Sequence, residues 1–163
     1  QSFTPDGFFK TGDLGTQLPD GQLKIIGRLK EQFKTSKGKY VAPAPIENRL
    51  NAHPMIELSM VSGSGFEKAY ALVVLAEHLR PTMHLEHVRT EVEAELTSLL
   101  DQVNKHIADY EQLKMLVIAK EAWSIENGCL TPTMKIKRSR IEYSVQHEIE
   151  NWYSKQSKNV LWA

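Results

Sequence analysis

The sequence predicts a small α+β domain. Three strand-like apolar runs, at residues 55–61, 69–77 and 114–119, occur among several helical segments and do not follow a strict βαβ alternation. That mixture is typical of α+β domains with one small sheet flanked by helices. The chain has 163 residues, of which 41% are hydrophobic, so it can bury the core of one such domain.

A β-hairpin is expected ahead of this domain. Residues 8–11 are aromatic and β-favouring, and residues 22–26 alternate polar and apolar side chains. Between them Pro19-Asp20-Gly21 provides a proline for the first turn position and a glycine for a positive φ. The basic segment that follows predicts a linker leading into short strands around Phe33 and Tyr40.

Three helices are predicted from caps and periodicity. Pro43 and Pro45 suit the first turn of a helix that ends at His53-Pro54. A long amphipathic helix follows, because apolar residues recur at three- and four-residue spacing: Leu85, Val88, Val92, Leu96, Leu99, Val103 and Ile107. Ser139 and Glu142 form a capping box for a final helix, whose apolar side carries Ile141, Val145, Ile149 and Trp152. Residues 130–137 are expected to be irregular.

The composition of the chain argues against several classes of protein. The formal net charge is zero, which argues against a general nucleic-acid or membrane binder. The single cysteine, Cys129, allows no internal disulfide and fits a reducing compartment. No apolar run approaches the roughly 20 residues that span a bilayer, and the N-terminus has no signal-peptide pattern. Because the chain starts with Gln1 inside an apparent strand, we expect it to be a piece of a longer protein.

Positive charge is concentrated in two short segments. Residues 28–39 carry five lysines and arginines against the one acid Glu31, and residues 135–140 add four more without an acid. Such local fields suit an anionic partner, most simply phosphates. A solvated connector is the alternative for the first segment, and a lysine such as Lys135, considered alone, is usually a surface charge.

Other candidate sites are weaker. His84, His87 and Glu91 stand at i, i+3 and i+7 and could line one helix face as metal ligands, but nothing else in the sequence completes such a site. Cys129 has no neighbouring histidine and is interpreted as an ordinary thiol. No serine lies in a nucleophile elbow, so covalent catalysis has no support.

Several motifs together resemble the C-terminal portion of the adenylate-forming (AMP-binding) superfamily, which includes acyl-CoA synthetases and peptide-synthetase adenylation domains. They lie, in the expected order, at residues 9–13, 27–31, 38, 41–47 and 127–138. The form Leu-Thr-Pro-Thr-Met-Lys-Ile-Lys-Arg in the last motif looks most like the long-chain fatty acyl-CoA synthetases. The resemblance runs through almost the whole chain.

The resemblance implies two structural parts. Residues 1–28 would be the terminal hairpin of a large N-terminal adenylate-binding domain that is otherwise absent. Residues 29–163 would be the C-terminal lid that closes over that domain. Lys30 falls on the hinge about which the lid rotates.

The resemblance also implies roles for individual residues. Asp13 matches the aspartate that holds the ribose hydroxyls of ATP, and Arg28 matches a companion arginine. Gly38, with Lys37 and Lys39 beside it, corresponds to the loop that enters the thioester-forming site near the pantetheine arm of CoA. Lys135 corresponds to the catalytic lysine that reaches the carboxylate and the α-phosphate during adenylation. No metal ligand is assigned to this chain.

The expected function is therefore that of an ATP-dependent ligase that activates a carboxylic acid, most like a long-chain fatty acid, as acyl-AMP and transfers it to CoA. Substrates are ATP, CoA and the acid, with Mg²⁺ held mainly by the N-terminal domain, which is the expected protein partner. The isolated chain is expected to be inactive. The whole enzyme is expected to be cytoplasmic, and peripheral association with a membrane surface is the alternative. The alternatives are a ligase that loads a carrier protein, a non-catalytic anion-binding module and, with least support, a nucleic-acid-binding module.

Overall fold

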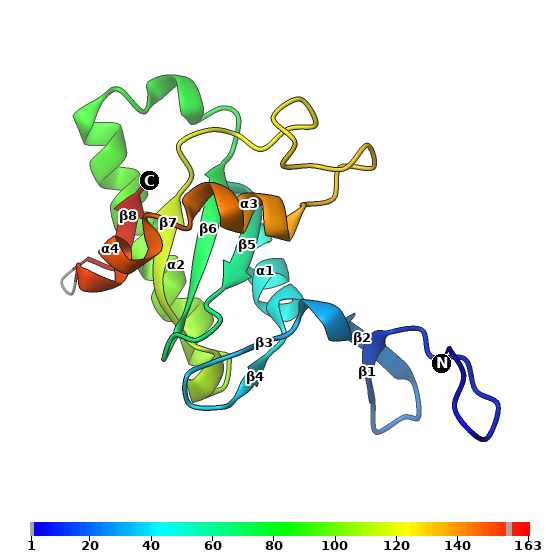
Figure 1. Ribbon diagram of the computed structural model, residues 1–163. Helices are drawn as coiled ribbons and strands as arrows, with labels where there is room; N and C mark the ends of the chain where they lie inside the picture. Colours follow the sequence, from blue (N-terminus) through cyan, green and yellow to red (C-terminus); the bar gives the residue numbers. More distant parts are fainter. Residues whose placement is uncertain (1, 156–157) are drawn as a thin grey trace.

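A four-stranded sheet forms the centre of the molecule in the computed structural model, which describes residues 2–155 and 158–163 (Figure 1). The strand order is β5-β6-β7-β8, with bounds Ile56–Ser62, Ala69–Leu75, Leu113–Ile118 and Val160–Trp162. β5 pairs with β6 antiparallel, whereas β6–β7 and β7–β8 are parallel. β5 is therefore one edge of this sheet.

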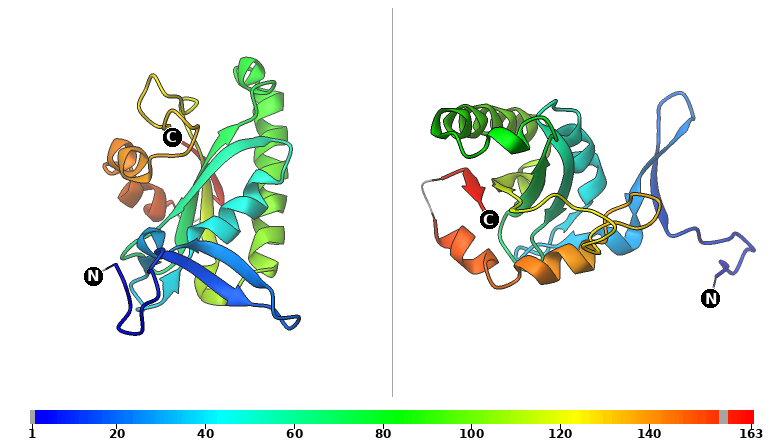
Figure 2. Two further views of the ribbon diagram at one scale, coloured as in Figure 1. Left: turned by 90° about the vertical axis from the view of Figure 1, so that its right-hand side faces the viewer. Right: turned by 90° about the horizontal axis from the view of Figure 1, so that it is seen from above.

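Helices cover both faces of the sheet, and this produces two cores (Figure 2). All seven residues of β6 are buried, and their side chains alternate between the two faces. On one face Ala71 and Val73 join a cluster with α1 (Pro43–Asn51) and α2 (Glu86–Lys105). On the other face Tyr70 and Leu72 join a cluster with α3 (Arg138–Val145) and α4 (Ile149–Ser154). The chain thus forms three layers.

An N-terminal hairpin projects from this body (Figure 1). Its strands are β1 (Asp13–Gln17) and β2 (Leu23–Arg28), paired antiparallel. A short 3₁₀ helix, η1 (Leu29–Glu31), connects β2 to the two-residue strands β3 (Phe33–Lys34) and β4 (Tyr40–Val41). Two further 3₁₀ turns lie at Arg80–Thr82 and Asp109–Glu111.

The α+β class is confirmed, but the sheet differs from the expected one in two ways. Among the described residues the central sheet has four strands rather than three, because the three-residue strand β8 is too short to show a periodic pattern. The chain also contains a parallel β6–α2–β7 crossover, contrary to the expected lack of βαβ alternation. The long segment between the two strands supplies the length that a parallel connection needs.

The hairpin and the last helix also differ from expectation. Residues 8–11 do not form the first strand: Phe9 pairs with Phe3 in an isolated bridge, and Gly12, at φ +77°, interrupts the chain before β1. The expected last helix is divided into α3 and α4. The capping box is absent, because α3 begins at Arg138 with Lys137 as its N-cap and Ser139 therefore lies inside the helix. The Glu142 carboxylate instead accepts a hydrogen bond from Ser62 Oγ at 2.6 Å.

The remaining elements lie where the sequence predicts them, including α1, β5, β6, β7 and the irregular segment before α3. Helix α2 begins at Glu86 and ends at Lys105, close to the predicted limits. Among the described residues, none of the helices is both long enough and apolar enough to cross a membrane.

Candidate functional site

Asp13 and Arg28 lie opposite each other at the open end of the hairpin. They are register partners on β1 and β2, and Arg28 Nε is 2.9 Å from Asp13 Oδ1. The arginine side chain is 61% exposed and the aspartate side chain 29% exposed. The pairing of adjacent strands thus brings together the two residues that the family resemblance assigns to the nucleotide.

Lys30 lies in the short segment between the hairpin and the body. It is exposed and belongs to η1, whose flanking residues Arg28 and Gln32 both have extended backbone conformations. A three-residue 3₁₀ helix without buried residues makes few contacts that would resist a change of backbone torsion. This junction is not part of a long helix or strand, so it is compatible with a pivot.

Gly38 occupies the left-handed position of a tight turn between β3 and β4. The Thr35 N–H donates to the Lys39 carbonyl at 2.9 Å, and the Gly38 N–H donates to the Thr35 carbonyl at 2.9 Å. The Thr35 hydroxyl also accepts the Lys39 N–H at 3.2 Å. Gly38 has φ +79°, as a three-residue hairpin loop of this kind requires. The turn holds Lys39 at the start of the returning strand.

Lys135 stands on a second turn with the same hydrogen-bond pattern. The Thr131 N–H donates to the Lys135 carbonyl at 2.8 Å, and the Met134 N–H donates to the Thr131 carbonyl at 2.9 Å. The Thr131 hydroxyl accepts the Lys135 N–H at 3.1 Å. Met134 takes the left-handed position at φ +61°, and Pro132 suits the first turn position. The two basic segments therefore each present a lysine, Lys39 or Lys135, from an equivalent place.

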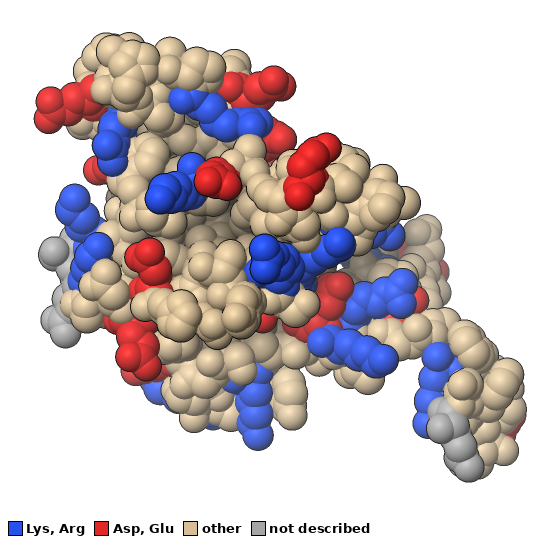
Figure 3. Space-filling view, turned by 45° about the horizontal axis from the view of Figure 1, so that its top comes forward, with Lys and Arg blue, Asp and Glu red and all other residues tan. Residues whose placement is uncertain are grey.

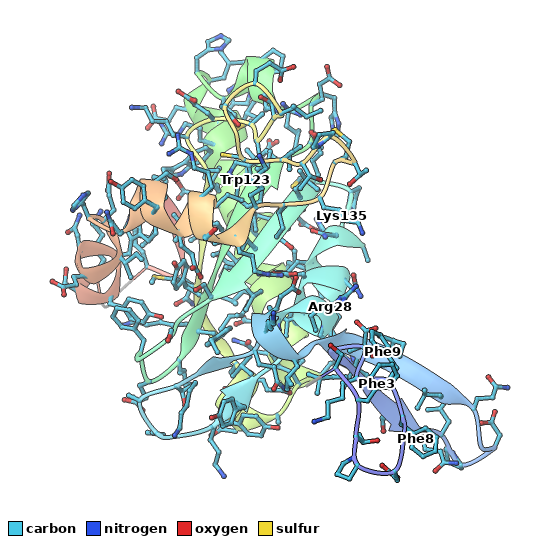
Figure 4. The ribbon with its side chains drawn as sticks, turned by 45° about the vertical axis from the view of Figure 1, so that its right-hand side comes forward. Phe3, Phe8, Phe9, Arg28, Trp123 and Lys135 are labelled. Atoms are coloured by element: carbon cyan, nitrogen blue, oxygen red, sulfur yellow. The ribbon has the colours of Figure 1, made fainter. Side chains whose placement is uncertain are left out.

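The ammonium of Lys135 is exposed, and among the described residues it forms no ion pair or hydrogen bond. Leu130 and Ile136 form a bridge at the base of its turn. Figure 4 shows Lys135 on an outer loop of the body, with Arg28 between it and the aromatic side chains Phe3, Phe8 and Phe9 in this view. A fixed backbone with a free ammonium suits contact with an anion.

Lys37 and Lys39 have different surroundings. Lys37 Nζ is 2.6 Å from Glu67 Oε1, and this contact raises the pKa of Lys37 and lowers the pKa of Glu67. Both side chains are exposed, so the pair adds little stability. Lys39 has no ion pair within the part of the chain that the structure describes. Both lysines line a surface cavity of about 270 Å³ that Lys68 and Tyr110 also line.

Sequence reasoning missed a buried ion pair beside these elements. Arg138 Nη2 donates to Glu47 Oε2 at 2.6 Å, and Glu47 Oε1 accepts the Val61 N–H at 2.7 Å. The carboxylate is 9% exposed and the guanidinium 18% exposed. A carboxylate buried on an otherwise apolar helix face, as Glu47 is between Ile46 and Leu50, was the signal that could have found the pair.

The structure gives no support to the weaker candidates. His84 lies before the first residue of α2, so His84, His87 and Glu91 do not share a helix face. One ring nitrogen of His84 lies 2.9 Å from the Pro81 carbonyl oxygen. No group of three or more His, Cys, Asp or Glu side chains among the described residues could hold a metal ion. Cys129 is buried, and burial raises the pKa of its thiol. It lines a cavity of about 320 Å³ together with Trp123.

Charges of both signs are interspersed over the face shown in Figure 3. Lysines and arginines there alternate with aspartates and glutamates instead of forming one continuous basic surface. The positive charge of the two basic segments is therefore a local feature. A local feature of this kind suits a small anion better than an extended polyanion.

Comparison with known proteins identifies the fold and the family. A family model described as "AMP-binding enzyme C-terminal domain" matches residues 30–157. The chain is 33% identical over 168 residues to the long-chain-fatty-acid–CoA ligase FadD15 of Mycobacterium tuberculosis, covering 96% of this chain and 28% of that protein. It is 32% identical to the peroxisomal long chain acyl-CoA synthetase 7 of Arabidopsis thaliana, covering 91% of this chain and 23% of that protein.

Among solved structures, the adenylation domain of a carboxylate reductase from Mycobacterium chelonae has the same fold, with a TM-score of 0.79 and 24% sequence identity. The match covers 94% of this chain and 24% of that one. The chain thus spans about a quarter of the length of the proteins that it matches. With the family model matching most of its residues, this chain belongs to the C-terminal domain family of AMP-binding, adenylate-forming enzymes.

Proposed function

We propose that this chain is the C-terminal part of an AMP-forming acid–CoA ligase that acts on long-chain fatty acids. In this proposal residues 1–28 are the last hairpin of the adenylate-binding domain, and residues 29–163 are the lid. The substrates are ATP, CoA and the fatty acid, and the ligands of the Mg²⁺ that accompanies ATP belong to sequence outside this chain. Two relatives with more than 30% identity are named as a long-chain-fatty-acid–CoA ligase and a long chain acyl-CoA synthetase, and these names support a long-chain fatty acid as the substrate and CoA as the acceptor.

The observation that carries the proposal is the position of Lys135. Its backbone is held by the hydrogen bonds of a tight turn, while its ammonium is exposed and free of ion pairs within the described residues. Adenylation brings a carboxylate towards the α-phosphate of ATP, and these two anions repel each other. A lysine delivered to that point offsets the repulsion as the carboxylate oxygen bonds to phosphorus and pyrophosphate leaves.

The second step uses the other turn. After pyrophosphate leaves, rotation at Lys30 withdraws Lys135 and brings the Gly38 turn to the acyl-adenylate. The CoA thiol gives its proton to solvent, its sulfur bonds to the acyl carbon, and AMP leaves with the electron pair of the broken C–O bond. The equivalent geometry of the two turns supports this division of work, because each presents one lysine to an anionic reactant. Such movement of one element between two steps is a common form of gating.

The exposed apolar side chains of the N-terminal segment support the assignment of residues 1–28 to a larger domain. Phe8, Phe9, Leu23 and Ile25 are all more than half exposed, and Phe3 packs on Phe9 with ring centroids 5.4 Å apart. Large apolar side chains left exposed together on one segment often mark an interface. In this proposal it packs against the rest of the adenylate-binding domain.

The test is the Lys135→Ala substitution in the full-length enzyme, with each half-reaction measured separately. We expect the rate of acyl-adenylate formation to fall by about 10²- to 10³-fold, since loss of one transition-state contact to an oxyanion typically has that effect. Thioester formation from supplied acyl-adenylate should be unchanged. Lys105→Ala, which removes an exposed lysine in the last turn of α2, is the matched control. Equal loss of both half-reactions would contradict the role of Lys135.

Two alternative functions are separated by the same assays. An enzyme that loads a carrier protein would transfer the acyl group to that protein and leave free CoA unreacted, so both acceptors are offered to the wild-type enzyme. A non-catalytic binding module would show no ATP–pyrophosphate exchange with any fatty acid. Between CoA and a carrier protein as the acceptor, the names of the relatives with more than 30% identity favour CoA.

A further inference from the structure

Arg138 connects the Lys135 turn to the body of the fold. It lies three residues beyond Lys135, and the Lys137 N–H, just before it, donates to the Cys129 carbonyl at 2.8 Å. Its Nη2 donates to Glu47 on α1 at 2.6 Å, and its Nη1 donates to the Val61 carbonyl on β5 at 3.3 Å. Arg138 is therefore the point at which the chain that carries Lys135 is fixed to both a helix and the sheet edge.

The third nitrogen of the guanidinium is incompletely satisfied. Arg138 Nε is buried and has no hydrogen-bond partner among the described residues. Glu31 Oε2 lies 3.8 Å from this Nε, within ion-pair range but too far for a hydrogen bond. A buried N–H that faces a carboxylate just outside bonding distance is an unusual arrangement, because buried donors are nearly always paired.

Glu31 is the last residue of η1 and directly follows Lys30. Its side chain is 41% exposed, and the structure gives it no other ion pair within the described residues. A displacement of the Glu31 carboxylate by about 1 Å would bring it to a normal charge-assisted hydrogen-bond distance from Nε. Rotation of the backbone at Lys30 moves its sequence neighbours on this scale, so the contact can report the orientation of the junction.

We propose that Arg138 is a positioning residue that couples rotation at Lys30 to the Lys135 turn. Its Nε–Glu31 hydrogen bond forms in one orientation of the lid and is broken in the other, while the bonds to Glu47 and Val61 persist in both. The contact thereby stabilises one orientation and holds the base of the Lys135 turn in register with the pivot. This inference rests on the proposed function for the existence of two orientations.

The test is Glu31→Gln in the full-length enzyme, because it removes the charge of the partner and leaves the buried Arg138–Glu47 pair intact. We expect the rates of adenylation and of thioester formation to change in opposite directions, so that their ratio shifts by about three- to ten-fold. The thermal unfolding temperature should not change. Glu77→Gln, at an exposed acid that forms no ion pair among the described residues, is the matched control and should leave the ratio unaltered.

A distance measurement tests the coupling without reference to activity. Nitroxide labels at Asp20→Cys on the hairpin and His87→Cys on α2 report the orientation of the lid by double electron–electron resonance. Glu31→Gln should redistribute the population between the two distances, and the same substitution in an Arg138→Lys background should add nothing, since lysine has no Nε–H donor at that position. Arg138→Lys keeps a positive charge beside Glu47, which limits the structural damage.

The outcomes separate this inference from the proposed function. An unchanged distance distribution in Glu31→Gln, or equal changes in both half-reaction rates, overturns the role of Arg138 and leaves the ligase proposal standing. A wild-type enzyme without ATP–pyrophosphate exchange overturns the ligase proposal, and the distance distribution still decides whether Glu31 biases the junction. A shifted rate ratio together with a shifted distribution supports the coupling.

Discussion

Removal of the Glu47 carboxylate is expected to be among the most destabilising single changes in this chain. β5 is the edge of the sheet, and the N–H and C=O groups of Val61 point away from β6 to Glu47 and Arg138. Glu47→Ala removes one charged hydrogen bond to Val61 at 2.7 Å and one to Arg138 at 2.6 Å. Each such bond contributes roughly 1.5–3 kcal/mol. Breaking a buried ion pair by removal of one partner costs about 3–5 kcal/mol, so we expect a loss of that size.

Urea unfolding of the chain followed by circular dichroism measures this loss from the midpoint and the slope. Glu47→Gln should be less destabilising than Glu47→Ala, because its side-chain oxygen can still accept the Val61 N–H while the charge is lost. Glu77→Ala, at an exposed site, should change the free energy of unfolding by less than about 0.5 kcal/mol. A loss below about 1 kcal/mol for Glu47→Ala would show that the pair does not hold the sheet edge, and that Glu47 does not fix Arg138 to the body.

Three further predictions concern stability. Burial raises the pKa of Tyr70 to about 12 from its ordinary value of 10.0; the hydroxyl is neutral in both states below pH 10, but between about pH 10 and 12 the unfolded chain releases the proton and the folded chain keeps it. The free energy of unfolding should therefore fall by about 2–3 kcal/mol over that range. Urea unfolding at several pH values should show a smaller fall for Tyr70→Phe than for the wild-type chain, and an equal fall in both would refute the raised pKa of Tyr70. Gly38→Ala, at φ +79° and without a steric clash, should destabilise the chain by about 1 kcal/mol. Met134→Gly in the equivalent turn should be neutral or stabilising by up to about 1 kcal/mol in the same unfolding assay, because glycine removes the backbone strain at φ +61°. A clear destabilisation would show that the Met134 side chain makes a contact that outweighs this strain.

Local sequence determined most of the secondary structure because the signals there are short-range. The proline pair at the start of α1, the three- and four-residue spacing in α2 and the apolar runs of β5, β6 and β7 each depend on residues close together in the chain. The order of the motifs along the chain also predicts the family, and the family model confirms it. The roles of Asp13, Arg28, Lys30, Gly38 and Lys135 remain predictions.

Tertiary structure decided the features that depend on partners distant in sequence. The strand β8 exists because β7 offers it a parallel neighbour, and the Glu142 carboxylate, which the sequence placed in a capping box, accepts a hydrogen bond from the distant Ser62. The equivalence of the Thr35 and Thr131 turns appears only in their hydrogen bonds, since the left-handed position is glycine in one and methionine in the other. The buried pair of Glu47 and Arg138 likewise joins residues 91 positions apart: the apolar helix face could mark Glu47 as an unusual acid, but only the fold shows that Arg138 is its partner.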